Sequence, residues 1–142
     1  MQLEEMLAYK VTMLASDLSE SLSKEYAAFQ LTMPQWRIVA TLGARHEKMR
    51  DPSITAKNIV TATRLDKVQV SRAIERLVKK DMVTKRASKS DKRAFLIRLT
   101  TQGEEVYNTI LPRVVSWQNN RLKNITKDEY RIFLKVIHAL TP

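Results

Sequence analysis

The sequence is poor in the residues that cross-link or turn a chain, with no cysteine, two glycines and four prolines among 142 residues. Without cysteine there are no disulfides, no thiolate metal sites and no cysteine-based redox sensing. With so few glycines and prolines, the composition favours long helices and few turns. We therefore expect a mostly α protein.

Long apolar runs are also missing, because no stretch reaches the roughly 18 apolar residues that a membrane helix needs. The first residues include Glu4 and Glu5, where a signal peptide would carry basic residues. These two features predict a cytoplasmic protein with no membrane partner.

The motifs of catalysis are missing as well. The chain has no Gly-rich phosphate loop, no nucleophile constellation and no metal-ligand spacing such as HExxH, and its two histidines, His46 and His138, are far apart in the sequence. We expect no enzymatic activity, no metal and no cofactor.

Positive charge is abundant and concentrated in one part of the chain. Residues 57–98 contain 13 basic and four acidic residues, a net charge of +9, whereas the whole chain has +10. A basic charge confined to one segment is typical of a surface that binds a polyanion such as nucleic acid.

Helix starts are marked by side chains that can accept hydrogen bonds from the first backbone N–H groups. Apolar residues spaced three and four apart predict one long amphipathic helix over residues 3–26. Three capping boxes and two single caps predict the later starts: Thr32 with Gln35, Asp66 with Gln69, Thr126 with Glu129, and Thr55 and Thr100 alone.

The helix that follows Asp66 has the most informative pattern. Its apolar stripe consists of Val70, Ala73, Ile74, Leu77 and Val78. At 100° per residue, the opposite face carries Val68, Ser71, Arg72, Glu75 and Lys79. An exposed apolar residue in the first turn of a basic helix is suited to contact a thymine methyl group. With the shorter helix after Thr55, this forms a predicted helix-turn-helix.

Two short apolar runs at residues 82–84 and 94–99 flank the polar turn ASKSDKR, which predicts a β-hairpin with a basic tip. The predicted order is helix, helix, helix-turn-helix, hairpin, helix, helix. We therefore assign residues 31–100 to a winged helix-turn-helix DNA-binding domain. Residues 1–30 and 101–142 form a helical dimerisation region.

The terminal helices are apolar along one side, and a second copy of the chain could bury these sides in an isologous dimer. The alternative is that they pack on the chain's own helices. The residues expected at the dimer interface are Leu3, Leu7, Leu14, Leu18, Phe133, Ile137 and Leu140.

The runs TMPQWRIVATL and LDKVQVSRAIERLVKKDMVTKRASKSDKRAFLIRLTTQG resemble the MarR family of bacterial winged helix-turn-helix regulators. The most specific parts are VSRAIERL, the wing SDKRAFLIRLT with its Asp-x-Arg, and Gly103. The resemblance implies a homodimer whose first and last helices interlock. It also implies a recognition helix in the major groove and a wing at the minor groove. Family members are mostly repressors, and many are released from DNA by a small aromatic ligand.

Two departures from the family pattern concern geometry. Asp81 stands where the family usually has a glycine, at a helix end that favours left-handed backbone. The segment 45–52 is a few residues longer than usual. It contains Arg45, Lys48 and Arg50, which either lie in a solvated loop or add phosphate contacts.

The residues expected to contact DNA come from the predicted recognition helix and wing: Lys67, Val68, Gln69, Ser71, Arg72, Lys89, Asp91, Lys92 and Arg93. A guanidinium at position 72 can pair with guanine, the alternative being an ion pair with Glu75 or Glu104. Arg93 is expected in the minor groove, and the resemblance implies that Asp91 orients it. The two wing lysines are expected on phosphates.

These features predict a sequence-specific regulator of transcription that binds double-stranded DNA, a dimeric repressor on a pseudo-palindromic operator. The alternative is a basic architectural or RNA-binding module without sequence preference.

Five large side chains either line a pocket for an effector or belong to the core, so no ligand-binding residue is assigned: Met6, Met13, Tyr26, Trp36 and Tyr107.

Overall fold

Six α-helices and a small antiparallel sheet form the computed structural model, which describes residues 1–91 and 93–142. The helices are α1 (Leu7–Tyr26), α2 (Met33–Lys48), α3 (Ala56–Thr63), α4 (Lys67–Lys79), α5 (Thr101–Leu122) and α6 (Lys127–Leu140), with short 3₁₀ turns η1 (Leu3–Glu5) and η2 (Ala27–Phe29). The strands are β1 (Ile54–Thr55), β2 (Val83–Ala87) and β3 (Phe95–Leu99). The predicted fold class, mostly α with a small wing, is confirmed.

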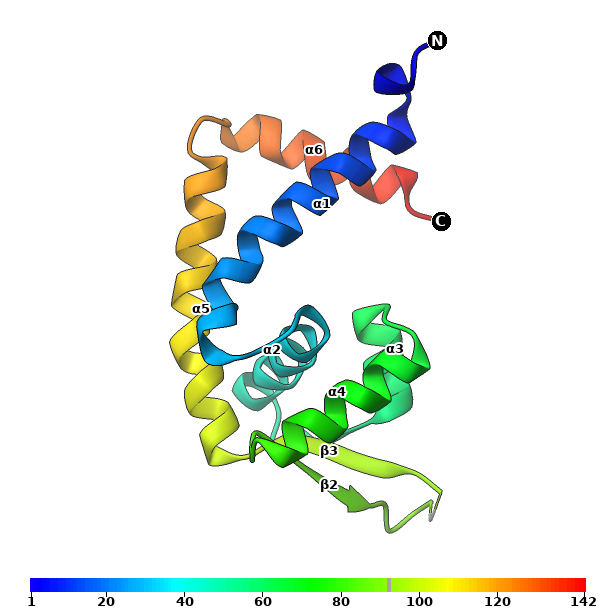
Figure 1. Cartoon of the computed structure of the whole chain (residues 1–142), viewed down its shortest axis with the longest axis vertical. Coiled ribbons are helices and arrows are strands. Elements are labelled where there is room, and N and C mark those ends of the chain that lie inside the picture. Colours follow the sequence, from blue (N-terminus) through cyan, green and yellow to red (C-terminus); the bar gives the residue numbers. More distant parts are fainter. Residues whose placement is uncertain (92) are drawn as a thin grey trace.

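Helix α5 runs the length of the molecule and connects its two ends (Figure 1). Helices α1 and α6 lie at one end, together with both termini, whereas α2, α3, α4 and the sheet lie at the other (Figure 1). The assignment of residues 1–30 and 101–142 to dimerisation, and of 31–100 to DNA binding, stays a prediction.

The five helix starts that were predicted from capping residues are confirmed. Capping boxes form at Thr32, Asp66 and Thr126, and the hydroxyls of Thr55 and Thr100 each accept a backbone N–H three residues ahead. Each cap satisfies a backbone donor that would otherwise lack a partner. These short-range hydrogen bonds explain why the boundaries were readable from the sequence.

Three details of the predicted secondary structure were wrong. The first helix starts at Leu7 rather than Leu3, because Met6 adopts an extended backbone after η1. Val78 is 38% exposed, since it lies at the edge of the apolar stripe of α4. Strand β1 was missed because two residues show no alternation; it pairs Ile54 with Ile97, which gives a three-stranded sheet in the order β1-β3-β2.

The hydrophobic core lies where α2 meets α3, α4, the sheet and α5. Its fully buried side chains are Ile38, Val39, Leu42, Ile59, Leu77, Ile97 and Ile110. Tyr26 and Trp36 stack with ring centroids 5.8 Å apart and are buried, as is Tyr107. Met6 and Met13 are exposed. Tyr26, Trp36 and Tyr107 are therefore core residues.

Asp81 forms the joint between α4 and the wing, and its φ of 58° is left-handed. The N–H of Met82 donates to the carbonyl of Leu77 at 2.9 Å, which closes the end of α4. The Thr100 hydroxyl, at the start of α5, donates to the carbonyl of Asp81. The joint therefore has the left-handed geometry that favours glycine, with a carboxylate near the negative end of the α4 dipole.

We expect Asp81→Gly to raise the free energy of unfolding by about 1 kcal/mol. The change removes left-handed strain and an unfavourable helix-end charge, partly offset by the greater freedom of glycine in the unfolded chain. Asp81→Asn is the matched control, because it removes only the charge and should give a smaller gain. Urea unfolding at a fixed protein concentration measures both. A loss of stability in Asp81→Gly would contradict this account of the joint.

Candidate DNA-binding surface

The outward face of α4 is exposed over its first two turns. Lys67, Gln69, Ser71 and Arg72 are exposed, and Val68 has 57% of its side chain accessible. The opposite face is buried against the core through Val70, Ala73, Ile74 and Leu77. Burial of one face fixes the rotation of the helix, so these polar side chains are directed away from the protein.

Gln69, one of the predicted contact residues, also has a structural role. Its side chain accepts the Asp66 N–H at 3.4 Å, while the Asp66 carboxylate accepts the Gln69 N–H at 2.8 Å. The carboxamide oxygen of Gln69 is thus occupied in the capping box, and its NH₂ group remains a donor.

The tip of the wing is shaped by short hydrogen bonds. The Ser88 N–H donates to the carbonyl of Ala94 at 3.0 Å, and the Asp91 carboxylate accepts the backbone N–H of Arg93 at 3.0 Å. The Asp91 side chain therefore contacts the backbone of Arg93. Among the described residues, no ion pair joins the side chains of Asp91 and Arg93. Lys89 is exposed in the turn. Lys92 lies outside the described residues.

A groove of about 1060 Å³ separates α4 from the wing. Five cationic residues and one carboxylate are among the residues that line it: Lys57, Lys67, Arg72, Lys85 and Arg93, with Glu75. The structure thus brings α3, α4 and both strands of the wing to one positively charged surface. It also places Val68 and Ser71 there.

Lys57, Lys85 and Phe95 are groove residues that the sequence analysis did not select. The Lys85 ammonium lies 4.4 Å from the centre of the Phe95 ring, a cation–π contact that holds it on this face of the wing. Strand alternation could have identified Lys85 and Phe95, because both share a sheet face with the buried Ile97. Lys57 lies in the first turn of α3, outside the predicted recognition helix.

One basic residue of the +9 segment, Lys80, serves the fold instead. The Lys80 ammonium donates to the carbonyl of Gln30 and to the side chain of Gln35, and burial, aided by the nearby Arg76 charge, lowers its pKa. The hydrogen bond of Asp51 with Ser53 lowers the carboxyl pKa, to which the charges of Arg86 and Arg98 also contribute. The basic surface is therefore smaller than the charge count indicated.

The longer segment 45–52 is held by Arg45. Its guanidinium donates to the carbonyls of Pro52 and Ser53 at 2.9 and 3.2 Å. Arg45 thus binds the backbone of its own loop, a role that neither a solvated loop nor a phosphate contact describes. Lys48 and Arg50 are exposed.

Helices α2 and α5 meet at two polar contacts. His46 Nδ1 lies 2.5 Å from the Glu104 carboxylate, so His46 has a carboxylate neighbour that its sequence position did not reveal. The Tyr107 hydroxyl donates to Glu47 at 3.1 Å, and burial together with this bond raises the pKa of Tyr107 to about 12.

Among the described residues Arg72 has no ion pair with Glu75 or Glu104.

The described residues contain no cluster of three potential metal ligands. Within the same part of the chain, no helix combines the length and apolarity required to span a membrane.

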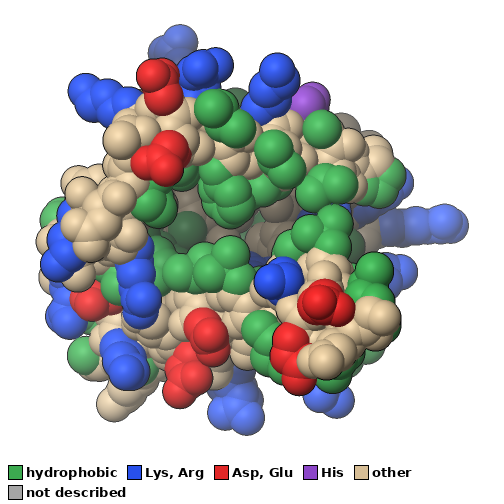
Figure 2. Space-filling model, turned by 90° about the horizontal axis from the view of Figure 1, so that it is seen from above, with side chains coloured by type: hydrophobic (Ala, Val, Ile, Leu, Met, Phe, Trp, Pro, Cys, Tyr) green, Lys and Arg blue, Asp and Glu red, His purple; other side chains and the backbone are tan. Residues whose placement is uncertain are grey.

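Most of the apolar side chains predicted at the dimer interface are exposed to solvent in the single chain. Leu3, Leu7, Leu14, Phe133, Ile137 and Leu140 are 44 to 58% exposed, whereas Leu18 is half-buried. Hydrophobic side chains border a hollow on the face of the molecule seen in Figure 2. The alternative, that the terminal helices bury these sides on the chain's own helices, does not hold for these six.

A helix-turn-helix of α3 and α4, followed by a wing whose strands share a basic groove with α4, defines the winged-helix class of DNA-binding domains. The model of the MarR family matches residues 29–94, which include most of this groove. This segment of the chain is therefore similar to the MarR family.

One curated relative and two solved structures show what the chain is similar to. The HTH-type transcriptional regulator BilQ of Clostridioides difficile is 29% identical over 91 residues, 64% of this chain and 62% of that regulator. The structure of a mutant of Escherichia coli MarR in complex with operator DNA has a TM-score of 0.83 at 21% identity, covering 96% of this chain and 94% of that one. A structure of BpsR from Bordetella bronchiseptica, which concerns regulation of DNA binding by 6-hydroxynicotinic acid, has a TM-score of 0.85 at 16% identity. The match covers 99% of this chain and 96% of that one.

Proposed function

We propose that this protein is a homodimeric transcriptional repressor that binds a pseudo-palindromic operator in double-stranded DNA. The observation that carries the proposal is the groove between α4 and the wing, where Arg72 and Arg93 line the same surface as three lysines. Helix α4 enters the major groove with Arg72, Ser71 and Val68 at the base edges. The wing tip, with Arg93, reaches the adjacent minor groove.

Phosphate and base contacts are divided between different residues in this proposal. Lys57, Lys67, Lys85, Lys89 and Lys92 bind phosphates and set the position of the protein. Arg72 pairs with guanine and Val68 contacts a thymine methyl group, which supplies sequence preference. Asp91 shapes the turn that presents Arg93, by its hydrogen bond to the backbone of that residue.

The dimer is supported by the exposed apolar sides of α1 and α6, which carry Leu7, Leu14, Phe133 and Ile137. A two-fold pairing removes these side chains from water and places two α4 helices on one side of the assembly. The recognition helices of such a dimer read half-sites about one DNA turn, roughly 34 Å, apart.

Selection of bound sequences from a randomised duplex pool at fixed salt tests this function. We expect one enriched motif with two inverted half-sites whose centres are roughly 10 base pairs apart. The competing function, a sequence-independent nucleic-acid-binding module, predicts that no motif is enriched. Enrichment of a single half-site without its inverted repeat would contradict the dimer but would still support sequence-specific binding.

We further propose that a small aromatic acid releases the repressor from its operator, as regulation of BpsR by 6-hydroxynicotinic acid makes reasonable for a protein of this fold. Adding phenolic acids to the complex with the selected duplex tests this directly. Release must depend on acid concentration at constant pH and ionic strength, because added salt alone weakens DNA binding.

A further inference from the structure

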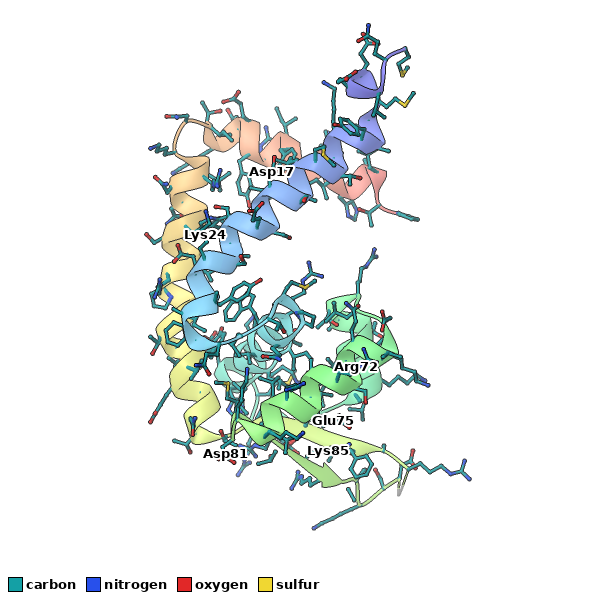
Figure 3. The ribbon with its side chains drawn as sticks, viewed as in Figure 1. Asp17, Lys24, Arg72, Glu75, Asp81 and Lys85 are labelled. Carbon is teal, nitrogen blue, oxygen red and sulfur yellow. The ribbon has the colours of Figure 1, made fainter. Side chains whose placement is uncertain are left out.

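Glu75 is the one carboxylate among the described residues that line the groove between α4 and the wing. It lies on α4 three positions after Arg72, and both face the same groove as Lys85 of β2 (Figure 3). Residues three apart on a helix are neighbours on its surface. Glu75 therefore belongs to the face that the proposed function directs at the bases.

The Glu75 carboxylate is not used by the fold. Its side chain is exposed, and among the described residues it has no ion pair, even though Arg72 and Lys85 line the same groove. In contrast, the carboxylates of Asp66 and Glu104 are engaged, by the α4 cap and by His46 respectively. The structure thus gives no intramolecular reason for an acidic residue here.

A carboxylate on a surface that approaches phosphates repels them, and a hydrogen bond that it accepts from a base can offset this cost. In the major groove, the exocyclic N4 amino group of cytosine is the donor that Glu pairs with. An advance of three residues along a helix is about 4.5 Å, close to the 3.4 Å rise between base pairs. A base read by Glu75 therefore lies next to the base read by Arg72.

We propose that Glu75 is a specificity-determining residue, which accepts a hydrogen bond from cytosine N4 at the base pair adjacent to the one contacted by Arg72. The same carboxylate reduces binding to DNA that lacks a donor at this position. This inference rests on the proposed function, and it adds that a repulsive group on the recognition helix contributes to discrimination.

The test compares the wild type with Glu75→Gln and Glu105→Gln in the duplex-pool selection and in binding to random DNA. Glu105 is an exposed residue of α5 that does not line the groove, so its substitution changes the net charge equally. Glu75→Gln should lose roughly 5- to 100-fold of the preference for cytosine at one position of each half-site, in favour of adenine, which glutamine can pair with. It should also bind random DNA more tightly. Glu105→Gln should select the wild-type motif.

The outcomes separate this inference from the proposed function. If the wild type selects a motif and Glu75→Gln selects the same one, Glu75 reads no base and the inference is overturned, while the proposed function stands. If the wild type selects no motif, both are overturned. Circular dichroism and the melting temperature of each variant show that the exposed substitutions leave the fold intact.

Discussion

Arg72→Ala is expected to weaken binding to the selected operator by about 1 to 3 kcal/mol for each half-site and to abolish the base preference at one position. The guanidinium is exposed, lines the groove between α4 and the wing, and has no ion pair within the described residues. It is therefore free to form two parallel hydrogen bonds with guanine O6 and N7. Binding isotherms on the selected duplex and on single-base variants of it measure the effect.

Two controls distinguish base reading from simple attraction to phosphates. Arg72→Lys keeps the charge but loses the planar fork, so it should retain binding to random DNA and lose discrimination. Lys89→Ala should weaken binding to every sequence alike and lower the slope of log K against log salt by about 1 for each half-site. Equal loss of specific and random binding in Arg72→Ala would remove Arg72 from the set of base-reading residues.

The fold was predictable from the sequence where local chemistry determines it. Capping by Thr32, Asp66 and Thr126 involves residues three positions apart, so each helix start is determined by a few neighbouring side chains. Strand β1 depends instead on pairing with β3 about 40 residues later, and two residues carry no period of their own. The sequence analysis missed β1 because this pairing joins residues far apart in the chain, whereas the caps join near neighbours.

The site was predictable to the extent that one helix face forms it. The periodicity of α4 identified Val68, Ser71 and Arg72, which all line the groove. Lys57 and Lys85 reach the same groove from α3 and β2, and only the tertiary fold brings them there. A charge count could not distinguish them from Lys80, whose ammonium is turned inward to Gln30 and Gln35.

Gly103→Ala is expected to lower the free energy of unfolding by about 3 kcal/mol, at the upper end of what overpacking costs. A Cβ at this position would lie 2.1 Å from the carbonyl oxygen of Met82. That oxygen accepts the Thr100 N–H at 3.0 Å, and the Met82 N–H donates to Leu77. The carbonyl therefore cannot move without opening the joint between α4, the wing and α5. Urea unfolding at a fixed protein concentration measures the loss.

Gly43, the other glycine of the chain, provides the contrast that makes this prediction specific. A Cβ there would meet the Tyr107 ring at 2.3 to 2.5 Å, so the obstacle is a side chain rather than backbone. Gly43→Ala should also destabilise the protein, but adding Tyr107→Leu should restore part of the loss, because the smaller side chain leaves room. For Gly103→Ala, adding Leu99→Ala should restore nothing, since the Met82 carbonyl remains. Recovery by Leu99→Ala would show that α5 packs on the Leu99 side chain and not on the backbone of the joint.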